Sequence, residues 1–211
     1  LLFFTATNFA MSIANVLFTP MVLSFTTSTV LGVILSVAGV GMLAGSLTMS
    51  AWGGPKRRVY GILGSSLLMG IGAAAAGLQP NAWLIGVSAF LVFFTFPISN
   101  SCSQAIWQSK TAPDVQGRVF SVRRMIAWAS VPVSYLLAGP LADHVVNPLL
   151  VEGGQLAGSV GQIIGVGEGR GIGLLYIILG FLILLTVVIA YRYPRLRQVE
   201  IELPDFIDSK A

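Results

Sequence analysis

Charged residues are the scarcest class in this sequence. Only 9% of the 211 residues are Asp, Glu, Lys or Arg, while 55% are hydrophobic, and the mean hydropathy is +0.84. An ordinary soluble domain carries roughly 25% charged residues because its surface must face water. Too few charges are present here to coat a globule of this size, so the composition predicts a membrane protein and argues against a soluble fold.

Cysteine and histidine are almost absent as well. The chain has one cysteine, Cys102, and one histidine, His144, so it cannot form an internal disulfide and offers no cluster of metal ligands. No serine and histidine fall on plausible neighbouring helix faces, as a hydrolase triad would require. We therefore expect no enzymatic activity, no cofactor and no metal site.

Long stretches carry no formal charge at all. Residues 1–55, 59–109, 125–142 and 171–191 are free of Asp, Glu, Lys and Arg. A membrane-spanning helix needs about 20 apolar residues, so the first two stretches are each long enough for two spans and the others for one. Proline and glycine clusters place the breaks. The sequence predicts an all-α membrane protein with six transmembrane helices, at about 1–22, 30–50, 59–78, 82–107, 119–146 and 171–191. Residues 1–191 form the membrane unit, and 192–211 a cytoplasmic tail.

The basic residues gather on one side of this six-helix path. Basic residues mark the cytoplasmic side of a membrane protein. Eleven of the twelve follow the second, fourth or sixth helix, and only Arg170 falls on the other side. Both ends of the segment are then predicted to be cytoplasmic. Because orientation explains the net charge of +4, the charge does not indicate nucleic-acid binding. The eleven are Lys56, Arg57, Arg58, Lys110, Arg118, Arg123, Arg124, Arg192, Arg195, Arg197 and Lys210.

A glycine-rich run, "GVGEGRGIG" at 165–173, precedes the sixth helix and invites comparison with a phosphate-binding loop. No Lys-Ser/Thr follows it, it does not fit G-x-G-x-x-G, and no strand precedes it. It also lies on the predicted non-cytoplasmic side, where nucleotides are scarce. We interpret it as a loop that leads into the last helix.

Three stretches of the chain resemble the major facilitator superfamily. "WGGPKRRVYGIL" (52–63) is similar to the second copy of its loop motif, a tight turn followed by a basic cluster. "APDVQGRVFSVRRM" (112–125), followed by "GPLAD" (139–143), and "GEGRGIGLLYIILG" (167–180) resemble the regions of the eleventh and twelfth helices in its drug-efflux branch, which contains macrolide efflux pumps and the enterobactin exporter. The Asp that usually precedes the basic cluster is lacking, since the sequence there reads "SAWGG" (50–54).

The resemblance implies a fold and a set of partners. The chain would be helices seven to twelve of a twelve-helix transporter, with an N-terminal six-helix half missing. It would lie in a bacterial plasma (inner) membrane, contact the lipid bilayer, and move a small-molecule substrate with proton or ion coupling. The residues that carry the loop motif, expected to act in conformational change, are Gly53, Gly54, Lys56, Arg57 and Arg58.

Polar residues recur along one face of two predicted helices. Thr5, Asn8, Ser12, Asn15 and Thr19 are spaced 3, 4, 3 and 4 apart. Asparagine in hydrocarbon is costly without a partner or water, so this face must look into the bundle or into a wet cavity. The alternative to a substrate pathway is interhelical hydrogen bonding. The resemblance favours a pathway, because the seventh and tenth helices line it in this family. The predicted pathway residues are Asn8, Ser12, Asn15, Phe96, Asn100, Gln104 and Trp107.

The second polar face follows Pro97 in the fourth helix. Phe96, Asn100, either Ser103 or Gln104, and Trp107 recur there at helical spacing, and an aromatic and amide lining suits a bulky, partly apolar solute. The alternative is a kinked structural helix whose Trp107 anchors it at the membrane interface.

Asp143 and His144 are the one adjacent acid and imidazole pair of the chain. A histidine near its intrinsic pKa can relay protons, so the pair is a candidate for proton coupling. The alternative is an interfacial pair that marks the end of the fifth helix.

Two functions fit these patterns. The first is a secondary active exporter of small amphipathic molecules, of the drug or siderophore type, that works by alternating access. The second is a non-transport six-helix membrane anchor or assembly subunit. The polar faces favour the first, because a plain anchor needs no asparagine within the membrane.

Overall fold

The computed structural model describes residues 2–202 and 206, and most of these residues are helical. Within these residues, six segments are long and apolar enough to cross a membrane: Leu2–Leu23, Ser28–Trp52, Arg58–Leu78, Ala82–Lys110, Gln116–Leu150 and Arg170–Arg192. Their positions confirm the six predicted spans to within a few residues at each end, apart from Leu1, which lies outside the described residues. Five spans contain one helix each: α1 (Leu2–Leu23), α2 (Ser28–Trp52), α3 (Arg58–Leu78), α4 (Ala82–Lys110) and α9 (Arg170–Arg192).

The fifth span is divided. It consists of α5 (Gln116–Trp128), α6 (Ser130–Pro140), the π-helical turn η1 (Leu141–Val146) and α7 (Asn147–Leu150). Proline explains both interruptions, because it has no N–H to donate to the carbonyl four residues earlier. Pro132 leaves the carbonyl of Trp128 without that bond, and α5 ends there. Pro140 does the same to Leu136, just before the π-helical turn.

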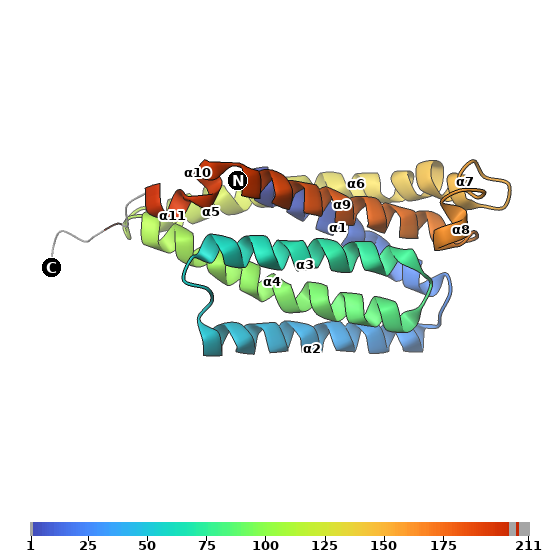
Figure 1. The fold of residues 1–211 in the computed structure, drawn as a ribbon, viewed down its shortest axis with the longest axis horizontal. Helices are drawn as coiled ribbons and strands as arrows, with labels where there is room; N and C mark the ends of the chain where they lie inside the picture. The colour runs from blue at the N-terminus through green and yellow to red at the C-terminus, as the bar shows by residue number, and fades with distance from the viewer. Residues whose placement is uncertain (1, 203–205, 207–211) are drawn as a thin grey trace.

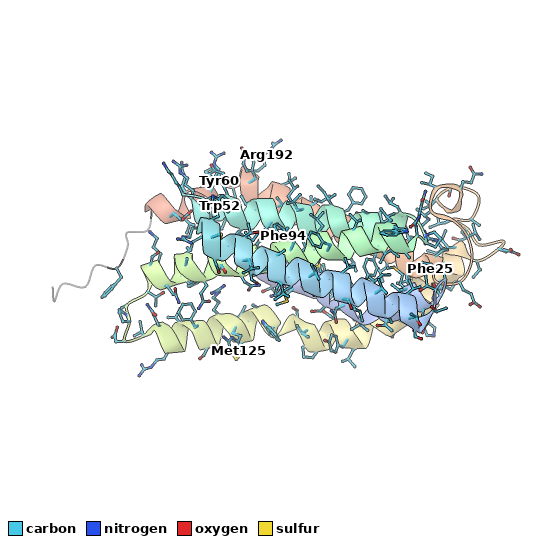
Figure 2. The ribbon with its side chains drawn as sticks, turned by 90° about the horizontal axis from the view of Figure 1, so that it is seen from below. Phe25, Trp52, Tyr60, Phe94, Met125 and Arg192 are labelled. Carbon is cyan, nitrogen blue, oxygen red and sulfur yellow. The ribbon has the colours of Figure 1, made fainter. Side chains whose placement is uncertain are left out.

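The three basic segments lie at one end of the bundle. Figure 1 shows the α2–α3 turn, the α4–α5 connection and the end of α9 at the same end, with the 151–169 loop and the short α8 (Gly161–Ile164) at the other. In Figure 2 the labelled Trp52, Tyr60 and Arg192 gather at this end, opposite Phe25. We call it the basic end. Six antiparallel spans require this arrangement, since connections after even-numbered spans return to the same side.

The α3 helix is the centre of the packing, in contact with α4 on one side and α9 on the other. Glycines allow the close approach at these contacts. A Cβ added to Gly77 would lie 2.1 Å from the carbonyl oxygen of Gly173 in α9, and one added to Gly180 would lie 2.7 Å from that of Gly70. On the far side of α4, a Cβ at Gly45 of α2 would lie 2.1 Å from the oxygen of Phe94. In lipid the hydrophobic effect does not drive helices together. Small residues let the helices approach closely, so that van der Waals packing stabilises the contact.

The outward surface of the bundle is strongly apolar. The large side chains exposed in the described structure include Leu43, Leu47 and Phe181, each more than 60% exposed. Water would make such a surface unstable, whereas hydrocarbon accepts it. The protein is therefore a multi-pass integral membrane protein.

The glycine-rich run before α9 is the loop that the sequence predicted. Gly165, Gly167 and Gly169 have φ values of 93°, 126° and 75°, in the region that residues with a Cβ rarely adopt. The first three glycines of the run thus follow from the backbone path into α9, while Gly171 and Gly173 lie within the first turn of that helix.

Candidate functional site

The polar face of α1 is half-buried at one end and exposed at the other. Asn8 is half-buried, and its Nδ2 donates a hydrogen bond to the carbonyl oxygen of Ala127 in α5 at 3.2 Å. Ser12 is also half-buried, while Asn15 is exposed. Asn8 therefore links two helices, as the packing alternative requires, while the Asn15 amide faces outward in the way a pathway residue must.

The polar face of α4 is mostly open. Phe96 is 44% exposed, and Asn100 and Gln104 are exposed on the same helix face. The Nδ2 of Asn100 donates to the carbonyl oxygen of Phe96 at 3.1 Å, one turn earlier in the same helix. It does not bond to the carbonyl of Phe93. That carbonyl lacks its usual helical donor because residue 97 is a proline, which has no N–H. The amide of Asn100 is thus held near its own backbone and remains accessible from outside the helix.

Trp107 is different, because it belongs to a cluster around Arg123 of α5. The guanidinium carbon of Arg123 lies 5.4 Å from the centre of the Trp107 ring and 5.8 Å from that of Phe4 in α1. Its Nη2 donates to Ser103 Oγ in α4. One cation thereby joins α1, α4 and α5, and cation–π contacts of this kind are worth about 0.5–2 kcal/mol.

The sequence interpretation missed the role of Arg123, which it placed with the other basic residues of the α4–α5 connection. Its neighbour Arg124 and nearby Arg118 are exposed, while Arg123 turns inward. Adjacent helical residues point about 100° apart, so one of an Arg-Arg pair can face the bundle and the other the surroundings. The sequence gives no sign that Arg123 contacts both Phe4 and Trp107, because these two aromatic residues are 103 positions apart.

A cavity of about 240 Å³ lies beside this cluster, at the basic end. Its walls come from α1, α3, α4, α9 and two short C-terminal helices, α10 (Pro194–Arg197) and α11 (Val199–Glu202). The lining includes Phe3, Phe4, Ser103, Trp107, Leu196 and Val199. A second hollow follows one face of α5 and includes Arg124, Met125 and Trp128. Neither of these two hollows is lined by Asn8, Asn15 or Asn100.

The basic turn between α2 and α3 has a defined geometry. Gly53 and Gly54 have φ values of 73° and 87°, and the Gly53 N–H donates to the carbonyl of Met49 to end α2. Lys56 and Arg57 are exposed. Arg58 begins α3 and is half-buried, and its Nη1 reaches back to the Gly53 carbonyl at 3.4 Å. The two glycines supply the tight turn, and the three cations that follow lie where the chain re-enters the bundle.

Glu200, which the sequence interpretation did not single out, is the acid that meets this turn. Its Oε1 accepts from the N–H of Arg58 and its Oε2 from the N–H of Val59, both at 3.0 Å. Part of the predicted tail is thus folded onto the basic end. Lys210 and the rest of 203–211 except Phe206 lie outside the described residues.

Asp143 and His144 lie on the π-helical turn η1, far from the basic end, and both side chains are exposed. Among the residues that the structure describes, no three His, Cys, Asp or Glu side chains are grouped so that they could hold a metal ion. The proton-linked role of the pair stays a prediction.

Three relatives share sequence with part of this chain. Macrolide efflux protein A of Streptococcus pyogenes is 29% identical over 119 residues, which are 55% of this chain and 29% of that protein. Macrolide efflux protein A of Enterococcus faecalis is 30% identical over 95 residues, 44% of this chain and 29% of that protein. Multidrug efflux pump Tap of Mycolicibacterium fortuitum is 31% identical over 143 residues, 65% of this chain and 34% of that protein.

These matches confirm the resemblance found in the sequence. No family model and no solved structure matches the chain. The matched segments span about a third of the length of these relatives. With six membrane-spanning segments and a helical fold in its described residues, the chain is similar to macrolide and multidrug efflux proteins.

Proposed function

We propose that this chain is the six-helix half of a secondary active exporter that moves small amphipathic molecules by alternating access. The observation that carries the proposal is its similarity to efflux proteins from three species. The exposed polar groups of Asn15, Asn100 and Gln104 support it, because polar side chains on membrane helices are costly unless they meet a cavity or a second protein surface. The substrates are small molecules with apolar and polar parts, and the protein acts by transport and not by catalysis.

The partner surface in this proposal is a second six-helix half. In a two-half transporter the solute lies between the halves near the middle of the membrane. The open sides of α1 and α4 would then face that half, and their amides would meet the solute. A proton or another ion supplies the energy, with Asp143 and His144 as candidate proton carriers. The competing function, a membrane anchor or assembly subunit, would use the same surfaces only for packing.

The proposed orientation places the basic end on the cytoplasmic side of a bacterial inner membrane. Eleven of the twelve basic residues support this choice, since positive residues are retained on that side. Reporter fusions after Arg58 and after Gly154 should report opposite sides of the membrane, with Arg58 inside. Both reporters on one side would contradict the orientation.

Replacement of the exposed amides tests the function. In the full-length transporter, Asn15→Leu and Asn100→Leu should change which amphipathic compounds are exported, while the amount of inserted protein stays the same. Asn8→Leu should instead lower stability, because its amide bonds across to α5 at 3.2 Å. Ser36→Leu is the matched control, since Ser36 is exposed on α2 and bonds only within its own helix.

Chemical labelling provides the second measurement. Cysteines at positions 15 and 100, placed one at a time in a Cys102→Ala background, should react with a small water-soluble thiol reagent, and an exported compound should slow the reaction. If neither site reacts in any trapped conformation, and export is unchanged in both leucine variants, only the packing function of these amides remains.

A further inference from the structure

The C-terminal segment, which here means residues 194–202 and 206, turns back across the basic end and contacts three other parts of the chain. The carboxylate of Glu200 accepts one hydrogen bond from each of the first two backbone amides of α3, those of Arg58 and Val59, at 3.0 Å. These amides begin a helix and have no carbonyl partner within it. The residue just before them, Arg57, makes no capping bond with its own side chain. Glu200 therefore supplies the cap that the local sequence does not.

Charge favours the same contact. The start of a helix carries a partial positive charge, which a carboxylate stabilises. The turn before α3 adds Lys56, Arg57 and Arg58 and has no acidic residue of its own between residues 50 and 60. A carboxylate 142 positions later along the chain thus meets both the helix terminus and a basic turn.

Two further bonds fix the segment to the end of α4. The Nζ of Lys110 donates to the backbone carbonyl oxygen of Glu200 at 2.9 Å. The N–H of Phe206 donates to the carbonyl oxygen of Ser109, also at 2.9 Å. The segment consequently ties the start of α3 to the end of α4, two helix ends that the chain itself joins only through the far end of the bundle.

The apolar side of the segment lines part of the cavity of about 240 Å³. Leu196 and Val199 form part of its wall, together with Ile106 and Trp107 of α4. Val199 also packs against the buried cluster that includes Val59 and Val187. Polar bonds on one side and apolar contacts on the other are what a covering segment needs in order to exclude water.

We propose that the C-terminal segment is a lid over this cavity, and that the carboxylate of Glu200 is the catch that holds the lid on the start of α3. The closed lid shields the apolar wall of the cavity at the basic end, and loss of the catch exposes it. The inference rests on the contacts of the lid alone and does not depend on which compound is exported.

Labelling of the cavity wall tests the lid. A cysteine at position 106, in the Cys102→Ala background of the full-length protein, should react slowly with a small charged thiol reagent while Glu200 is present. Glu200→Ala should speed the reaction about tenfold, which corresponds to about 1.4 kcal/mol. Glu200→Gln should give a smaller increase, because its amide keeps one acceptor oxygen but loses the charge. Glu152→Ala, an exposed acid at the opposite end of the bundle, should leave the rate unchanged.

Hydrogen exchange separates an open lid from a damaged fold. In Glu200→Gln the amides of residues 58 and 59 should exchange faster, while those at the centre of α3 keep their protection. A chain that ends at Gln198 should label at position 106 as fast as Glu200→Ala. Equal labelling rates in the parent and in both Glu200 variants would overturn the proposal, as would rapid labelling of the parent.

Discussion

The two ends of α3 are both capped by a charged residue from a distant part of the chain, yet they differ in kind. At the basic end Glu200, half-buried on a short helical segment, accepts from the first amides of the helix. At the other end Arg170, only 6% exposed, donates from Nη2 to the carbonyl oxygens of Gly77 and Leu78 at 3.0 Å each. Each charge has the sign that the helix dipole favours. The same electrostatic principle thus stabilises a buried contact at the end of α3 and a partly exposed contact at its start.

The buried contact of Arg170 also explains why this one basic residue falls on the opposite side of the six-helix path from the other eleven. Arg170 begins α9, where the dipole of its own helix disfavours a cation. The bonds to the end of α3 offset that cost, and they require a long side chain with several donors. Arg170 is thus retained for a contact within the bundle, and its presence does not weaken the orientation inferred from the other basic residues.

Gly77 gives the largest effect that we expect at the buried end. An added Cβ would lie 2.1 Å from the backbone oxygen of Gly173, which can move only if the whole of α9 shifts. Gly77→Ala should therefore lower the free energy of unfolding by about 3 kcal/mol, at the upper end of the usual cost of overpacking. Reversible unfolding in mixed micelles, followed by circular dichroism, would measure it.

The matched control for this substitution lies in the same helix. Gly64 is exposed, and an added Cβ there would meet no atom within 4 Å. Gly64→Ala should be neutral or slightly stabilising, because alanine favours helix more than glycine does. Equal losses for the two alanine variants would mean that helix propensity, and not the approach of α3 to α9, controls stability here.

The sequence was sufficient to predict the structural features that depend on residues close together in the chain. Runs of apolar residues long enough to span a membrane predicted the six spans, and proline and glycine predicted the breaks between them. The positive φ values at Gly165, Gly167 and Gly169 belong to the same class of local effect. Each of these features is decided within about 20 positions of the chain, which is the range over which periodicity can be read.

The contacts of Glu200, Arg123 and Asn8 could not be predicted in the same way. Each joins helices that are distant in sequence, and the choice between an inward and an outward side chain depends on tertiary packing. Asn8 shows the limit clearly: its spacing with Ser12 and Asn15 placed it correctly on a polar face, but that spacing could not reveal that the carbonyl of Ala127 lies opposite it. A polar face on a membrane helix indicates a polar environment and leaves open whether that environment is solvent, solute or another helix.

Removal of the Arg170 cap should have a smaller effect than a Cβ at Gly77, and a larger one than any change at Glu200. Arg170→Ala leaves the buried carbonyl of Gly77 and the partly buried carbonyl of Leu78 without their donor, which costs about 2 kcal/mol. Arg192→Ala, at the exposed far end of the same helix, should cost less than about 0.5 kcal/mol, the usual range for a surface substitution. Glu200→Gln should resemble Arg192→Ala in global unfolding, because water can reach the amides that the carboxylate leaves. Unfolding of the three variants in the same micelles gives the comparison directly. If Arg170→Ala and Glu200→Gln lower the free energy of unfolding equally, then the two ends of α3 do not differ as the burial of their caps requires.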